Sequence, residues 1–389
     1  MRLAGVTCAA VAAAMVGATV GAGAPPTAFS ADVQWHGIRL TADADNLDIV
    51  LAWVRHGATV PNASVIGNAT NGLPGLPLGP VGEEQAEKVA QQLAAELGSN
   101  VAGVYGGYEQ RMIQTATPFL HDEGLTTSNF QPLYGFNEVS GGFYTDAVPN
   151  SLGYYLDGLA LVSWVFGLRF VPLPGSNAFN GMVFENQVNN AINTVYANNV
   201  ADPVVSDNGH VTDAVFSGGA TITAWSLMNA NNIDLAVFLP LLFNTLASGN
   251  EDDFIANASI TQLVGNPEVG WTLESFQGQS MPAYPGLLSA LLVDFRNLIT
   301  PPQMAGWDLF QAIMNGSTTN IGGAPVDVTL TTVPEVFGAG MTSVADAIVQ
   351  FPRAVFDSLT EAAQRFGDAL DAGVSFPDAF GTVIIGLPS

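Results

Sequence analysis

Residues 49–57 read Ile-Val-Leu-Ala-Trp-Val-Arg-His-Gly, an apolar run that ends abruptly in Arg55, His56 and Gly57. An unbroken apolar run of this length is typical of a strand buried on both faces of a parallel sheet. Such strands present functional groups at their carboxyl ends, where open α/β sheets bind ligands. Arg55 has a planar fork of donors that suits a phosphate or carboxylate. His56 can attack through a neutral ring nitrogen, and Gly57 allows the backbone to turn closely beneath a ligand.

Residues 51–277 alternate apolar strand-like runs with helical patterns. This alternation predicts an α/β fold, a three-layer sandwich whose mostly parallel sheet has helices on both faces. A helix is expected from residue 80 to about Leu97, and residues 266–273 are expected to form a late strand that closes the sheet. We therefore predict one α/β domain over residues 31–277.

Three further segments follow the first strand in a specific order. Residues 78–86 read LGPVGEEQA, residues 111–116 read RMIQTA, and residues 137–142 read NEVSGG. Together with the Arg-His-Gly strand end, this order resembles the histidine phosphatase superfamily, whose fold is that of phosphoglycerate mutase. Asn62 also matches an asparagine often found in the first loop of that family.

One feature of that family is absent. Its second catalytic histidine normally ends a later strand as Val-Ser-His-Gly-Gly, whereas residues 214–219 here read Ala-Val-Phe-Ser-Gly-Gly, which puts Ser217 in its place. His210 comes just before this strand, which places it about 20 Å from the strand's carboxyl end at about 3.3 Å per residue, so it is a poor substitute. Two alternatives therefore stay open, namely reduced catalytic activity and complete loss of activity.

The resemblance implies phosphoryl transfer through a phosphohistidine at His56. Arg55 and Arg111 would hold the phosphoryl oxygens, where charge spreads in the transition state. Glu138 would protonate the leaving oxygen and then activate water, with Asp146 as the alternative acid. This chemistry requires no metal and no organic cofactor.

Other positions complete the predicted site. Ser217 can donate one hydrogen bond to a phosphate oxygen but cannot carry positive charge. Gly57, Asn62 and Gly218 are expected to bind substrate. Residues 146–208 interrupt the motif order and are expected to form a lid over the site, although their aromatic side chains could instead fill a second core. Arg169 within this segment is expected to reach substrate anions, unless it packs against the acidic surface.

The chain is strongly acidic, with 9 Lys+Arg against 34 Asp+Glu and a formal net charge of -25. Such a surface repels nucleic acid and anionic lipid. The expected partner is a small phosphorylated substrate or a phosphate-like anion. The four histidines at 36, 56, 121 and 210 lack metal-ligand spacing, so we expect no metal site.

Both ends of the chain have distinct compositions. Residues 1–30 have a basic start, an apolar middle and small residues before the expected cleavage point, which predicts a signal peptide and an exported protein, secreted or in the cell envelope. An uncleaved membrane anchor is the alternative. Residues 278–389 are expected to form a mainly helical C-terminal extension with an amphipathic helix at 344–370, kinked or split at Pro352. The apolar stripe would pack on its own domain or attach to an envelope component.

Three functions follow in order of preference. The first is an exported phosphomonoester hydrolase that uses His56, with activity reduced by the lost histidine. The second is a catalytically inactive protein that keeps an anion-binding pocket. The third is a cell-envelope interaction protein that uses the α/β domain as a scaffold.

Overall fold

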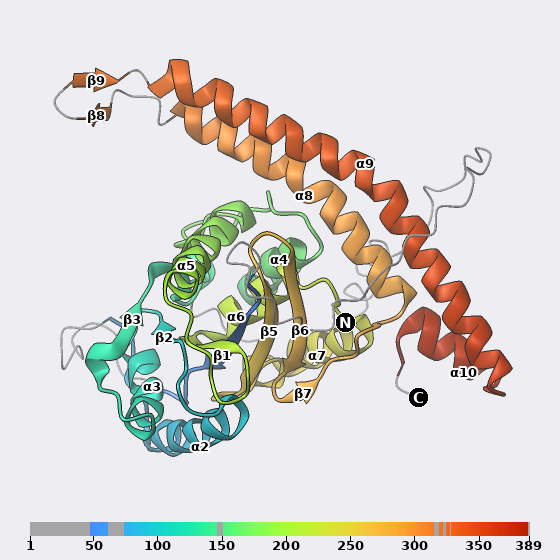
Figure 1. Cartoon of the computed structure of the whole chain (residues 1–389). Helices are drawn as coiled ribbons and strands as arrows, with labels where there is room; N and C mark the ends of the chain where they lie inside the picture. Colours follow the sequence, from blue (N-terminus) through green and yellow to red (C-terminus); the bar gives the residue numbers. More distant parts are fainter. Residues whose placement is uncertain are drawn as a thin grey trace. The chain divides into compact units, whose positions relative to one another are not determined.

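A computed structural model of the protein describes residues 47–60, 74–145, 151–314, 319–321, 324–326 and 328–387. Its main sheet has seven strands in the order β3-β2-β4-β1-β5-β6-β7 (Figure 1). Strands β3, β2, β4 and β1 run parallel to one another, whereas the pairs β1–β5, β5–β6 and β6–β7 are antiparallel. The predicted α/β sandwich is confirmed. The bounds are β1 Ile49–Arg55, β2 Gly103–Gly106, β3 Phe130–Pro132, β4 Val211–Ser217, β5 Ile260–Asn266, β6 Gly270–Phe276 and β7 Gln279–Ser280.

Strand β1 is buried along its whole length, as its apolar run predicts. Successive side chains point to opposite faces of a strand, so one run serves two cores. Leu51 and Trp53 belong to the cluster that includes Trp225 of α6 (Gly219–Asn229). Ala52 and Val54 belong to the cluster on the other face, which includes side chains of α2 and α3.

Helix α2 (Pro80–Leu97) begins and ends where its sequence allows. Pro80 stands in the first turn, where its missing N–H costs no helical hydrogen bond. Gly98 follows Leu97 with a φ of 72°, a conformation that favours glycine and stops the helix. The expected end near Leu97 is therefore confirmed. Together with α3 (Gln110–Asp122), α2 covers one face of the sheet.

The opposite face is covered by helices from the segment between β3 and β4 and from the chain after β4. These helices are α4 (Leu152–Val165), α5 (Gly181–Ala201), α6 and α7 (Leu235–Ser248). Val188, Ile192 and Val195 of α5 are buried in the same cluster as Trp53. Helix α5, although it lies in the segment expected to form a lid, is thus part of the layer that covers the sheet.

The C-terminal extension is helical, as expected. Helix α8 (Leu287–Met314) and helix α9 (Val328–Asp371) lie side by side in Figure 1. The shorter elements are β8 Thr319–Ile321, β9 Ala324–Val326, α10 Phe376–Phe380 and a π-helix at Gly381–Ile385. Helix α9 continues through Pro352, so of the two expected outcomes, a kink or a split, the split is wrong. Helix α9 packs along α8, which stabilises a helix that has lost one hydrogen bond at the proline. Among the described helices, none has the length and apolar character needed to cross a membrane.

Arg296 fixes α8 to the sheet domain. Its fully buried guanidinium donates to the carbonyl oxygens of Leu227 at 2.8 Å and Ala230 at 2.9 Å, at the carboxyl end of α6. Helix C-termini leave unpaired carbonyls that attract cations, so this contact satisfies both partners. The first helix of the extension is therefore part of the folded core.

Asp213 gives the fold a testable pH dependence. This side chain lies buried in β4, and its Oδ2 accepts a hydrogen bond from Nδ2 of Asn199 at 2.5 Å. Burial raises the pKa of Asp213 to about 7, and the bond from Asn199 opposes that rise. The native state therefore holds a proton that the unfolded state releases above its ordinary pKa, and stability falls as pH rises toward 7.

We expect Asp213→Asn to be more stable than the wild type at pH 8, by on the order of 2 kcal/mol. The amide keeps an oxygen for Asn199 and never ionises. Urea denaturation at pH 5 and pH 8 measures the effect, because the variant should lose less stability over this interval. Parallel pH profiles for the two proteins would show that another group titrates.

Candidate active site

The carboxyl ends of β1 and β4 form the centre of the site. Arg55 and Ser217 are register partners in the two parallel strands. The backbone N–H of His56 donates to the carbonyl oxygen of Ser217 at 3.1 Å. The structure thus brings together Arg55, His56 and Ser217, which the sequence predicted to meet at one sheet edge.

His56 is held as a neutral imidazole. Burial, the charge of Arg111 and the smaller effect of Arg55 together lower its pKa to about 3, and the bond to Gly57 opposes that change. Its Nδ1 lies 2.8 Å from the carbonyl oxygen of Gly57, which can only accept. The single proton therefore sits on Nδ1, and Nε2 keeps a lone pair that can attack an electrophile.

Hydrogen bonds to side chains of α2 and α3 hold the loop after β1 in place. The N–H of Gly57 donates to Oγ1 of Thr115 at 3.0 Å, and this hydroxyl donates to the carbonyl of Arg111 at 2.7 Å. The N–H of Ala58 donates to Oε1 of Gln85 at 2.8 Å. A Cβ atom at position 57 would lie 2.6 Å from the carbonyl oxygen of Gly82, so only glycine fits there. Gly57 therefore has a packing role as well as its expected place beside substrate.

Arg111 supplies the second cation. Its Nη2 donates to Oε1 of Glu109 at 3.3 Å. Burial raises the pKa of the Glu109 carboxyl, although the charge of Arg111 opposes that change. Among the described residues, the buried Nε of Arg111 has no hydrogen-bond partner, and buried donors of this kind are rare. Arg111 therefore has a donor that an anion can use.

Glu138 lies against the amino end of α6. Its Oε1 accepts from the N–H of Thr221 at 3.2 Å, and its own N–H donates to Oε2 of Glu109 at 3.3 Å. A Cβ atom at Gly218 would collide with the Glu138 carboxylate, so this position requires glycine. The predicted acid thus lies beside the strand end that carries Ser217. Glu109 and Thr221 were missed, because no pattern marks them apart from their nearness to the motif.

Arg55 is oriented by a distant loop. Its Nη1 donates to Oδ1 of Asp252, in the short helix η4 (Glu251–Asp253), at 2.7 Å and also to the carbonyl of Ile255. Its buried Nε has no partner in the described part of the chain. No sequence pattern predicts the pairing of Arg55 with Asp252, because the two residues are 197 positions apart.

Two predicted contacts need correction. The fully buried hydroxyl of Ser217 donates to the carbonyl of Phe136 at 2.7 Å, so its proton is not directed at a phosphate oxygen. Arg169 is 1% exposed and donates to Glu185 Oε2 at 2.8 Å and to the carbonyl of Met228 at 3.1 Å. With its donors occupied, Arg169 is a buried structural residue and not a substrate ligand.

Asn62 and Asp146, the other two predicted positions, lie outside the described residues. Within the described ranges, His, Cys, Asp and Glu side chains form no group of three or more that could hold a metal ion. The arrangement instead suits an anion, because a neutral imidazole with an available lone pair lies in the field of the buried Arg55 and the partly buried Arg111.

Comparison with known proteins agrees with this geometry. Residues 51–151 match the family described as the histidine phosphatase superfamily (branch 1). Over 317 residues the chain is 33% identical to the PE-PGRS family protein PE_PGRS11 of Mycobacterium tuberculosis (strain ATCC 25618 / H37Rv), covering 81% of this chain and 49% of that protein. The chain therefore spans about half the length of the curated relative it matches.

Solved structures with low similarity include two enzymes described by name. Phosphoglycerate mutase from Bacillus anthracis str. Sterne has 18% identity and a TM-score of 0.40, covering 60% of this chain and 95% of that chain. Mycobacterial glucosyl-3-phosphoglycerate phosphatase, solved with VO3, has 20% identity and a TM-score of 0.37, covering 59% and 98%. Residues 51–151, which include Arg55, His56, Arg111 and Glu138, thus match the histidine phosphatase superfamily.

Proposed function

We propose that this protein hydrolyses phosphomonoesters through a phosphohistidine at His56. The observation that supports this most is the neutral imidazole, whose Nδ1 faces the Gly57 carbonyl while Arg111 and Arg55 act on it electrostatically. Nucleophilic catalysis needs an unprotonated nitrogen, and the arginines that suppress protonation also attract the phosphate.

The reaction has two steps. Nε2 of His56 attacks phosphorus, the bond to the leaving oxygen breaks, and Glu138 gives that oxygen a proton. Water then attacks the phosphohistidine while Glu138 takes up a proton, which releases inorganic phosphate and restores the imidazole. Arg55 and Arg111 stabilise the charge on the phosphoryl oxygens in both steps.

An inactive anion-binding protein is the second candidate. Ser217 stands where a second histidine would supply a strong donor, and its hydroxyl is engaged by Phe136. Removing one such donor from a site of this kind costs about 10²–10³-fold in rate. Weak turnover and pure binding are therefore the two outcomes to separate.

A burst experiment with Glu138→Gln separates them. Aryl phosphates such as p-nitrophenyl phosphate have a good leaving group that needs little acid catalysis, so the variant should still form the phosphohistidine but hydrolyse it slowly. We expect a burst of about one equivalent of nitrophenol in rapid mixing, and no burst in Glu138→Gln/His56→Gln. Phosphate binding in calorimetry with neither burst nor turnover would support the inactive protein instead.

We also propose that the protein is exported and that its partner is a small phosphorylated molecule. The basic and apolar leader over residues 1–30 supports export, and sequencing the amino terminus of secreted protein tests it. Exposed Ile348, Val349 and Phe356 on α9 support the alternative that the extension contacts an envelope component. Pull-down with and without residues 328–389 tests that contact.

A further inference from the structure

Two helices beside the site are unusually apolar for such an acidic chain. Helix α7 contains no charged residue, and Asp157 is the single charged residue of α4. Both helices also expose large apolar side chains, among them Leu159 at 58% and Phe243 at 52%. Exposed apolar surface of this kind is a mark of binding surfaces.

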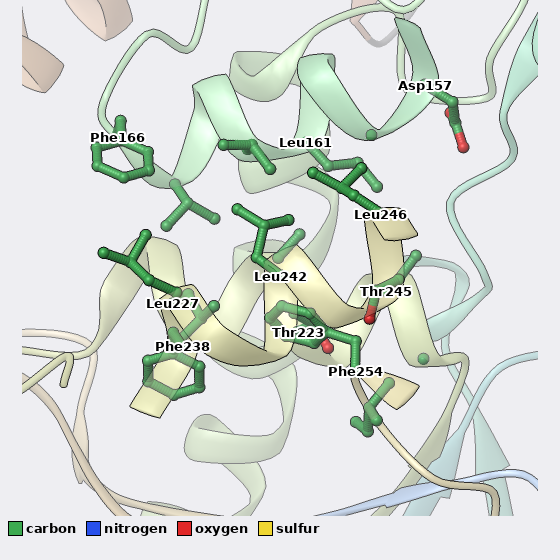
Figure 2. A pocket seen from close by; sticks show the side chains of 18 of the residues that line it. Asp157, Leu161, Phe166, Thr223, Leu227, Phe238, Leu242, Thr245, Leu246 and Phe254 are labelled. Atoms are coloured by element: carbon green, nitrogen blue, oxygen red, sulfur yellow. The ribbon is translucent and has the colours of Figure 1, made fainter. Parts of the chain in front are cut away.

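A cavity of about 170 Å³ lies between α4, α6 and α7. Figure 2 shows leucine and phenylalanine side chains directed into it from several sides. Apolar residues that line it include Leu161, Phe166, Leu227, Phe238, Leu242 and Leu246. An apolar cavity of roughly 150 Å³ binds benzene, so this one has room for a chain of about six to eight carbon atoms.

One end of the cavity reaches the candidate active site. Arg55, together with Gly219 at the amino end of α6 and Ile255, belongs to its wall. The buried Nε of Arg55 is the donor without a partner described above. Of the candidate catalytic residues in the described part of the chain, Arg55 alone lines this cavity, so a group attached to a phosphate bound at Arg55 would extend into it.

The cavity wall also carries two buried hydroxyl groups. In the described part of the chain, the buried Oγ1 atoms of Thr223 and Thr245 have no hydrogen-bond partner. Figure 2 shows both threonines in the cavity wall among apolar side chains. Buried hydroxyls usually have partners, so a ligand oxygen along the chain would fit there.

We propose that the cavity binds the apolar chain of the substrate, which is the phosphomonoester of a medium-chain apolar alcohol. The proposal rests on the proposed phosphatase function, which accounts for recognition of the substrate's phosphate. The cavity then selects substrates by the length of their apolar chain. Burying each methylene group strengthens binding by roughly fourfold at best.

Binding of n-butyl and n-octyl phosphate to the full-length His56→Gln protein tests the cavity without turnover. In calorimetry we expect octyl phosphate to bind at least tenfold more tightly. Wild-type protein should show the same preference in kcat/KM, measured below the micelle concentration. Equal affinity for the two esters would overturn the proposal.

Gly158→Leu should remove the preference by filling the cavity. A Cβ atom at Gly158 has Leu246 as its nearest neighbour, 3.9 Å away, so the larger side chain can enter from α4. We expect the ratio of octyl to butyl phosphate affinity to fall to threefold or less. Gly306→Leu on α8 is the matched control, because no atom lies within 4 Å of its added Cβ. If Gly158→Leu does not fold, Leu242→Trp fills the same space.

The two proposals fail in different ways. Tight octyl phosphate binding that Gly158→Leu abolishes, without hydrolysis by the wild type, would keep the cavity and refute the phosphatase. Hydrolysis at equal kcat/KM for both esters would keep the phosphatase and refute the cavity. If neither Gly158→Leu nor Leu242→Trp changed the preference for octyl phosphate, the apolar chain would bind elsewhere, and the cavity proposal would again be refuted.

Discussion

His56→Gln is expected to lower phosphomonoester hydrolysis by at least about 10³-fold in kcat/KM while the protein stays folded. Glutamine keeps a polar side chain of similar size but has no nitrogen that can form a phosphoenzyme. Binding of inorganic phosphate should persist, because Arg55 and Arg111 remain. Release of phosphate from a panel of phosphomonoesters measures turnover, and calorimetry measures binding.

The same variant has a second, independent readout. The His56 pKa of about 3 lies below its ordinary value, so the unfolded state binds a proton between about pH 6.5 and pH 3 that the native state does not. Wild-type stability should therefore fall as pH falls through this interval, and the fall should be shallower in His56→Gln. Hydrolysis that survives in the variant would contradict the assignment of the nucleophile, and an unchanged acid profile would contradict the neutral buried imidazole.

Arg296→Met is expected to reduce the free energy of unfolding by about 3–5 kcal/mol. The change leaves the carbonyls of Leu227 and Ala230 without their donor in a fully buried place. Burial and the charge of Arg169 lower the pKa of Arg296 to about 9, and the charge of Glu185 opposes that shift. The change therefore also removes one of the two arginines that interact with the buried Glu185. Urea denaturation at pH 7 measures the loss.

Arg365→Met is the matched control. Arg365 lies exposed on α9 and pairs with Glu361 one helical turn away, an interaction worth less than about 1 kcal/mol in general. Both variants remove one guanidinium, so net charge cannot explain a difference between them. Similar losses in the two proteins would show that Arg296 does not anchor α8.

The sequence predicted those parts of the fold that depend on local pattern. Strand β1 was recognised because its side chains alternate between two buried faces, which demands an unbroken apolar run. The end of α2 near Leu97 followed from the helical pattern that residues 78–86 lead into. The site residues Arg55, His56, Arg111 and Glu138 could be named because they stand in short segments whose order is fixed by the strand-helix alternation.

The orientation of individual side chains was not predictable in this way. Ser217 occupies the expected position, but its hydroxyl turns to Phe136, 81 residues away. Arg169 was expected to reach substrate anions, yet its guanidinium donates hydrogen bonds to the buried Glu185 and to the carbonyl of Met228.

The sequence by itself thus predicted the fold class, the end of strand β1 and the candidate nucleophile, because periodicity and backbone preference are local properties of the chain. The tertiary structure alone decided the pairing of Arg55 with Asp252, the anchoring of α8 by Arg296 and the cavity beside the site. These features join segments as much as 197 residues apart. They depend on which polar groups and apolar faces meet after folding, and the spacing along the chain does not encode that choice.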